Sequence, residues 1–201
     1  MTTQATPSQR GSYPKGQARR QQIVDAALAL FARSGYHASS LREIAKRVGV
    51  TTAGVMHHFA SKEELFTEVL RQRDERVREA AGDVSETTLL AQTRKVVAYN
   101  QATRGLTSLY TVISAEATDT EHPAHQYFVD RYAHGRTLAE ATLREAIAHG
   151  RLRDDLDVEL AARLIPAVMD GLQQQWLLDD SFDMTAAFDE FLRGYLRAPG
   201  A

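Results

Sequence analysis

The stretch from Ser39 to Lys62, SSLREIAKRVGVTTAGVMHHFASK, constrains the fold of this 201-residue chain more than any other segment. Ser40 and Glu43 have the spacing of a capping box, in which a serine oxygen accepts from a free amide at a helix start. Apolar residues then follow the i, i+3, i+4, i+7 spacing of one helix face, at Leu41, Ile44, Ala45 and Val48. Gly49 can adopt the left-handed conformation that ends a helix, so a short helix is expected here.

A second short helix is expected directly after this turn. Thr51 has the chemistry of an N-cap, and the helix would turn Val55 and Phe59 inward and leave Thr52, Ala53, Met56 and His57 outside. It should end near Ala60, because Ser61 and Glu64 form another capping box. Two short helices joined by a glycine-containing turn form the shape that places its second helix in the major groove of DNA.

The residues of this region are more specific than the helix-turn-helix pattern that they form. The informative positions, in order and without a gap, are Ile23, Ala26, Ala27, Phe31, Gly35, Tyr36, Ser40, Ile44, Ala45, Gly49, Val50, His58, Phe59, Ser61, Lys62, Glu63 and Leu65. With them, the segment from about Gln17 to Phe66, roughly a quarter of the chain, resembles the amino-terminal domain of TetR-family repressors.

The resemblance implies roles for individual residues. Thr52, Ala53 and Gly54, which follow the cap residue Thr51, would face base edges of double-stranded DNA. Contacts to the backbone or to adjacent bases would come from Ser40, Arg42, His57, His58 and Lys62. The family commonly has a DNA-contacting tyrosine at the position of Met56. A thioether cannot donate a hydrogen bond, so His57 or His58 would have to supply that contact.

Composition limits the classes of protein to which the chain can belong. Its length permits a sizeable core, and its 43% hydrophobic content is ordinary for a soluble protein. The absence of cysteine excludes a disulfide framework, a thiolate zinc site and a cysteine nucleophile. No apolar run is long enough to span a bilayer, and the first residues lack the hydrophobic core of a secretion signal. We therefore expect a cytoplasmic protein without a membrane partner.

Charge divides the chain into two unlike parts. Residues 1–62 contain nine basic and two acidic residues (+7), whereas residues 63–201 contain 15 basic and 24 acidic residues (−9). Drift on solvated faces can produce such a split, but here the basic part coincides with the helix-turn-helix pattern. The split fits a module that meets phosphates, joined to an acidic module with another role.

These patterns predict an all-α fold of about nine helices in three segments. Residues 1–16 are read as a flexible basic arm, with Lys15 and then Arg19 and Arg20 where it enters the first helix. Residues 17–62 form the helix-turn-helix domain, whose first helix spans 17–34, and a linking helix follows over 62–81. Residues 83–201 form a ligand-binding and dimerisation domain with expected helices over 86–102, 106–117, 123–149, 157–178 and 184–196. Pro166 is expected to kink or break the fourth of these.

The last two expected helices carry more apolar residues than a small antiparallel bundle needs for one seam. The TetR resemblance implies that they pair with their copies in a homodimer, and helix-turn-helix proteins commonly read palindromes as twofold dimers. The predicted interface consists of Leu160, Leu164, Val168, Leu172, Phe188, Phe191, Leu192 and Tyr195. The alternative is that these residues belong to the monomer core.

A second set of residues on different helices can line a pocket with a few polar tips. The set is Tyr99, Tyr110, Phe128, Tyr132, Met169, Gln173 and Trp176. Core packing is the alternative for each of them. If they bind a ligand, their aromatic and apolar character favours a small hydrophobic molecule.

The sequence contains no convincing metal or catalytic site. His122 and His125 lie three residues apart, but no third ligand follows at a recognisable spacing, so a surface helix start is the preferred interpretation. No nucleophile elbow, phosphate-binding glycine loop or zincin helix is present. The hypothesis is a cofactor-free, ligand-responsive regulator, most simply a repressor released from a palindromic operator. The alternatives are a helical dimerising scaffold that has lost DNA binding and an enzyme in the bundle.

Overall fold

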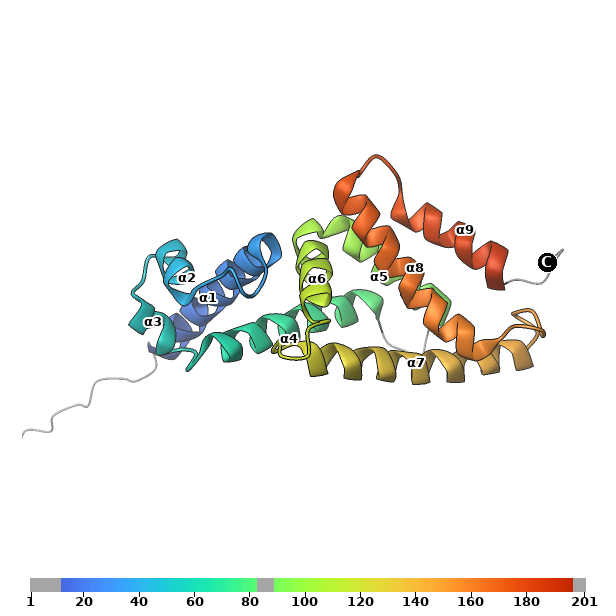
Figure 1. Ribbon diagram of the computed structural model, residues 1–201, viewed down its shortest axis with the longest axis horizontal. Coiled ribbons are helices and arrows are strands. Elements are labelled where there is room, and N and C mark those ends of the chain that lie inside the picture. The colour runs from blue at the N-terminus through green and yellow to red at the C-terminus, as the bar shows by residue number, and fades with distance from the viewer. Residues whose placement is uncertain (1–11, 83–88, 197–201) are drawn as a thin grey trace, which may run out of the picture.

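The computed structural model describes residues 12–82 and 89–196, and every regular element within these ranges is an α-helix, nine in all (Figure 1). The all-α prediction is confirmed. The helices are α1 (Ser12–Ser34), α2 (Leu41–Val48), α3 (Thr52–Met56), α4 (Lys62–Ala81), α5 (Leu89–Ala102), α6 (Arg104–Glu116), α7 (His125–Ala148), α8 (Val158–Leu178) and α9 (Met184–Leu196). Helices α1 to α3 form one end of an elongated molecule, and α4 runs from them toward the other helices.

The helix-turn-helix forms through the local signals expected of it. The hydroxyl of Ser40 accepts from the amide of Glu43 at 3.2 Å, and that of Thr51 accepts from Gly54 at 3.0 Å. Gly49 has a φ of 72° and ends α2. Helix α3 is shorter than expected, because it ends at Met56 rather than near Ala60.

The first helix begins earlier than expected. Residues 12–16, assigned from sequence to the flexible arm, belong to α1, so that boundary was wrong. Pro14 lies in the first turn, where a proline costs little because the amide it lacks would have no helical partner. Residues 1–11 of the predicted arm lie outside the described residues.

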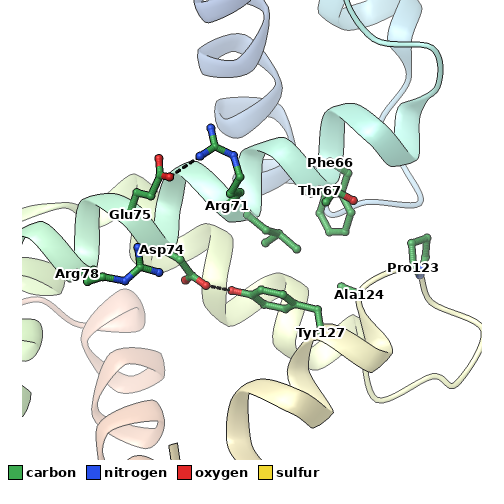
Figure 2. A pocket seen from close by; sticks show the side chains of 10 residues that line it. Phe66, Thr67, Arg71, Asp74, Glu75, Arg78, Pro123, Ala124 and Tyr127 are labelled. Atoms are coloured by element: carbon green, nitrogen blue, oxygen red, sulfur yellow. Dashed lines mark hydrogen bonds and ion pairs between the residues drawn. The ribbon is translucent and has the colours of Figure 1, made fainter. Parts of the chain in front are cut away.

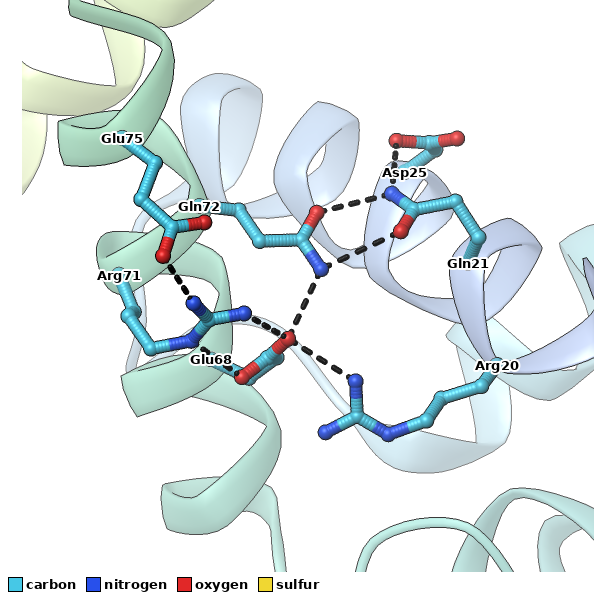
Figure 3. Close-up of polar contacts among 7 residues, drawn as sticks. All are labelled: Arg20, Gln21, Asp25, Glu68, Arg71, Gln72 and Glu75. Carbon is cyan, nitrogen blue, oxygen red and sulfur yellow. Dashed lines mark hydrogen bonds and ion pairs between the residues drawn. The ribbon is translucent and has the colours of Figure 1, made fainter. Parts of the chain in front are cut away.

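A polar cluster fastens α4 to α1 (Figure 3). Arg20 of α1 and Arg71 and Gln72 of α4 all donate to the carboxylate of Glu68, at 2.8–2.9 Å. The amides of Gln21 and Gln72 also exchange hydrogen bonds at 2.8 and 3.2 Å. Chiefly through Arg71, with Arg20 and Gln72, these bonds hold the pKa of Glu68 well below its ordinary value.

Two apolar cores are present, and their boundary does not follow the predicted domain boundary. The first combines side chains of α1 to α4 with Leu109, Tyr110 and Ile113 of α6 and Phe128 of α7. The second combines side chains of α5, the distal part of α7, α8 and α9. Helix α6 packs extensively on α1, so the helix-turn-helix module rests directly on the C-terminal bundle.

The C-terminal helices follow the sequence prediction with small shifts. Helix α8 continues through Pro166, so the predicted break does not occur, although the carbonyl of Ala162 loses the amide partner that a non-proline residue would supply. Pro123 precedes α7 instead of lying in its first turn. Residues 86–88 of the expected fifth helix lie outside the described residues. Among the helices of the described ranges, none is long and apolar enough to cross a membrane.

Candidate DNA-binding surface and interior polar site

The residues predicted to meet DNA lie on and beside the short helices α2 and α3. Most are exposed, namely Ser40, Arg42, Thr51, Thr52, Ala53, Met56 and His57, whereas Gly54, His58 and Lys62 are partly buried. Ser40, Arg42, Lys46, Thr51 and Thr52 help to line a shallow groove of about 600 Å³ where α2 meets the start of α3. The structure therefore brings two of the predicted backbone contacts, Ser40 and Arg42, together with Thr52, the first base-reading position, whereas His57, His58 and Lys62 do not line this groove.

The two histidines that follow α3 have different environments. His57 is exposed, whereas His58 is partly buried, and their ring centroids are 5.3 Å apart. Burial lowers the pKa of His58, and the nearby charges of His57, Arg20 and Arg19 lower it further. Met56 beside them is 52% exposed and cannot donate a hydrogen bond. His57 is thus the more accessible donor next to the position where the family commonly has tyrosine.

Lys62, the first residue of α4, is held against an aromatic ring. Its ammonium group lies 4.1 Å from the centroid of the Tyr36 ring, and the Tyr36 hydroxyl donates to Glu63 at 2.7 Å. Burial lowers the pKa of Lys62, while the carboxylates of Glu63 and Glu116 raise it in part. The predicted phosphate contact is therefore positioned at a helix N-terminus, where amides also point outward.

The turn after α1 is locked to the end of α6. Gly35 has a φ of 74°, and the amide of Tyr36 donates to Glu116 at 2.7 Å. A Cβ atom on Gly35 would lie 2.0 Å from an oxygen of Glu116. The close approach of this carboxylate joins the C-terminal bundle to the residues that lead into α2.

His122 is part of the same contact, which corrects the interpretation of His122 and His125 as a surface helix start. His122 is 3% exposed, and its ring packs against Tyr36, His37 and Phe66. The ring Nδ1 of His125 lies 2.9 Å from the carbonyl of Ala117. Within the described ranges, no group of three potential metal ligands was found.

The predicted ligand-binding residues do not form one group. Tyr110, Phe128 and Tyr132 come together, with ring centroids of successive pairs 5.4 and 6.4 Å apart. Trp176 is buried in the second core, and Met169 packs against that core. Gln173 is almost fully buried, whereas Tyr99 is only partly buried on α5.

A network of charged residues, missed by the sequence analysis, surrounds Tyr110. The guanidinium of Arg73 lies 4.4 Å from the centroid of the Tyr110 ring, and Arg73 and Arg131 each donate to Asp74 at 3.0 Å. Arg73 is only 2% exposed. Its position between Leu70 and Val77 on the apolar stripe of α4 is a signal that the sequence carries. That signal was obscured because the second half of α4 reads as charged on all sides.

Asp74 also borders a cleft between α4 and the segment that opens α7 (Figure 2). The cleft has a volume of about 290 Å³ and combines apolar side chains, including Phe66 and Leu70, with charged side chains of α4. The hydroxyl of Tyr127 donates to Asp74 at its edge. Burial raises the pKa of this phenol still further above neutral pH.

The predicted dimer residues differ in how much surface they leave free. Leu160 is 48% exposed, whereas Phe188 is fully buried in the second core of its own chain. The other six are partly buried, namely Leu164, Val168, Leu172, Phe191, Leu192 and Tyr195. Apolar surface on α8 and α9 is thus available to a partner, but Phe188 contributes none.

Comparison with known proteins also separates an amino-terminal part of the chain from a C-terminal part. Residues 23–69 match the bacterial regulatory proteins of the tetR family, and residues 85–198 match the C-terminal domain of BetI-type transcriptional repressors. The chain is 30% identical to the HTH-type transcriptional repressor AcnR of Corynebacterium diphtheriae over 157 residues, 76% of this chain and 78% of that relative.

Two solved structures share the fold. A transcriptional regulator from Saccharomonospora viridis in complex with choline has a TM-score of 0.75 at 23% identity, covering 91% of this chain and 100% of that chain. FadR from Bacillus subtilis in complex with stearoyl-CoA has a TM-score of 0.69 at 23% identity, covering 86% and 95%. The sequence matches go further than this likeness of fold. The chain belongs to the TetR family of DNA-binding, helix-turn-helix transcriptional regulators and has a C-terminal domain of the BetI type.

Proposed function

We propose that this protein is a homodimeric repressor that binds a palindromic operator and is released from it by a small molecule bound in the C-terminal bundle. The observation that carries the proposal is the exposed α2–α3 surface on the basic part of the chain, locked through Glu116 to the bundle. This arrangement gives a route by which a change in the bundle reaches the DNA-binding surface.

Operator recognition is assigned to two sets of residues. Thr52, Ala53 and Gly54 face base edges, and because they offer few side-chain donors, specificity also draws on methyl contacts and DNA shape. Backbone or adjacent-base contacts come from Ser40, Arg42, His58 and Lys62. His57 supplies the hydrogen bond that Met56 cannot make.

The dimer and effector assignments rest on different observations. The half-exposed Leu160 and the partly buried apolar side chains of α8 and α9 are assigned to the twofold interface. The bundle of residues 83–201 is assigned to effector binding, since two proteins of the same fold were solved with choline and with stearoyl-CoA. The effector shifts the equilibrium only if it binds the two arrangements of the dimer with different affinity.

Selection of bound sequences from a random duplex pool tests this function. We expect enrichment of a palindrome with two half-sites. Titration of that duplex at several salt concentrations should show about one unit less salt dependence for Lys62→Ala, because one phosphate contact is lost. His57→Ala should instead alter base preference or weaken binding, and Met56→Ala serves as the matched neighbour without a donor. Failure to enrich any duplex would favour a dimerising scaffold without DNA binding.

A further inference from the structure

Polar side chains on α4, α5 and α8 carry atoms that are shielded from solvent and have no hydrogen-bond partner among the described residues. Seven residues in 12–82 and 89–196 carry such atoms: Arg73, Gln92, Asn100, Gln101, Asp170 and Gln173 on these three helices, and His122, which packs beside Tyr36. A buried polar atom left unpaired loses its hydration without gaining a hydrogen bond, and folded proteins keep few such atoms. A concentration of unpaired atoms in one bundle indicates a site that receives polar groups from outside the chain.

A series of side-chain contacts connects two of these residues across the bundle. Arg73 of α4 covers the ring of Tyr110, whose hydroxyl lies 3.1 Å from that of Tyr132. The Tyr132 hydroxyl donates to Asp170 of α8 at 2.5 Å. The unpaired atoms at the two ends are complementary in kind, because Nε of Arg73 is a donor and Oδ1 of Asp170 is an acceptor.

Two carboxamides lie on the helices that flank this connection. Gln173 is one turn from Asp170 on α8, and Asn100 lies on α5, which packs against α8. The backbone carbonyl of Asn100 accepts from the hydroxyl of Thr107 at 2.7 Å, one turn before Tyr110 on α6. Asn100 and Gln173 are each 1% exposed, and neither of their amide groups has a partner among the described residues.

Charge around the connection is balanced. Arg73 and Arg131 contribute two cations, and Asp74 and Asp170 contribute two potential anions. Burial raises the pKa of Asp170, while its hydrogen bond from Tyr132 and the two arginines favour the ionised form. An additional net charge from a ligand would lack a counter-charge in a region of low dielectric.

We propose that these residues form the effector site and that the effector is a small polar molecule, neutral or zwitterionic. It offers an acceptor to Arg73 and a donor to Asp170, and it exchanges hydrogen bonds with the carboxamides of Asn100 and Gln173. This inference rests on the proposed ligand-responsive function. It replaces the hydrophobic effector expected from sequence, because an acyl chain or steroid body would leave these atoms unpaired.

Stability of the free protein provides the first test. Replacing an unpaired carboxamide with leucine removes a desolvation cost, so Asn100→Leu and Gln173→Leu should melt at or above the wild-type temperature without effector. Gln174→Leu, on the exposed side of α8, is the matched control and should change the melting temperature little. If both buried variants melt several degrees lower, the carboxamides are satisfied structural groups and the proposal is wrong.

Operator release provides the second test. The aqueous and organic phases of a chloroform–methanol extract of bacterial cells are added to protein bound to the selected operator. We expect release by the aqueous phase, by material that neither a cation nor an anion exchanger retains at pH 7. Gln173→Leu should need about tenfold more of that material, as expected for loss of paired hydrogen bonds, and Gln174→Leu should respond as wild type.

Two results of this second test would overturn the proposal. One is release of the operator by the organic phase. The other is release by an aqueous fraction to which Gln173→Leu and wild type respond at the same concentration. Operator binding before any addition is recorded for each protein, so failure of the proposed function, in which wild type binds no duplex, is distinguished from failure of this inference.

Discussion

At the level of single side chains, one carboxylate joins the helix-turn-helix module to the linking helix. Glu68 is 11% exposed and accepts hydrogen bonds from Arg20, Arg71 and Gln72. Its ionised form is therefore stabilised in the folded protein more than in the unfolded chain. A carboxylate with a lowered pKa contributes stability above its unfolded pKa and loses that contribution as the pH falls toward the folded value.

Glu68→Gln should therefore destabilise the protein most at neutral pH. We expect a loss of about 1–2 kcal/mol at pH 7, because three charged or polar donors lose an ionised acceptor. Toward pH 3 the difference from wild type should shrink, since Glu68 becomes protonated in the unfolded chain while it stays ionised in the folded protein. Chemical denaturation at both pH values measures this. Glu75→Gln, which removes a more exposed partner of the same Arg71, is the control and should show a smaller effect.

Gly35 should be intolerant of any side chain for two separable reasons. Its φ of 74° strains an L-residue, and a Cβ atom would collide with Glu116. Gly150 has a φ of 66°, and no atom lies within 4 Å of the position that a Cβ would occupy, so Gly150→Ala isolates the first reason. We expect Gly150→Ala to cost about 1 kcal/mol and Gly35→Ala clearly more in equilibrium unfolding. Equal losses would show that the Glu116 contact adjusts without cost.

At the level of helices, the elements that sequence predicted well are those whose signals are local. Ser40, Thr51 and Ser61 cap helices as expected, because a serine or threonine needs only an amide three residues ahead. In a full capping box the side chain of Glu64 would accept from the amide of the cap residue Ser61. Here it accepts from the amide of Ala60 instead. Glu43 pairs with Arg33 on another helix.

What sequence did not predict depends on contacts between distant residues. Arg73 is buried because Tyr110 covers its guanidinium and because Asp74 pairs with it and with Arg131 of α7, 57 residues away. His122 is buried for a similar reason, since its ring meets Tyr36 of the other module. The helix caps of the helix-turn-helix were therefore predictable from sequence, whereas the buried polar residues packed between the helices, apart from Gln173, were not.

Two capping serines allow the effect of a cap on helix stability to be measured apart from its effect on DNA contact. Ser61→Ala and Ser40→Ala each remove one cap hydrogen bond, so each should cost about 1 kcal/mol, or roughly 2–4 °C in melting temperature. Only Ser40 also lines the groove beside α3. Operator affinity, measured well below both melting temperatures, should fall for Ser40→Ala and remain near wild type for Ser61→Ala. Equal affinity for the two variants would remove Ser40 from the interface.

At the level of the whole molecule, the recognition helices of two subunits can read a palindrome only if an interface between the subunits fixes the separation of the two helices. Leu160 tests that interface, because it is about half exposed and lies at the start of α8 within the predicted dimer surface. Leu160→Glu should shift sedimentation from dimer to monomer, since it places a carboxylate in an apolar contact. Leu178→Glu alters a more exposed leucine of the same helix, outside the predicted set, and should remain dimeric.

Operator binding by Leu160→Glu links the interface to function. A dimer gains affinity because its second half-site contact is intramolecular, whereas a monomer binds each half-site independently. The variant should therefore bind the full palindrome only about as tightly as an isolated half-site, and its salt dependence should fall by about half because half as many phosphates are contacted at once. A variant that stays dimeric and keeps full-site affinity would place the interface elsewhere than Leu160. A monomer with full-site affinity would show that one chain suffices for recognition.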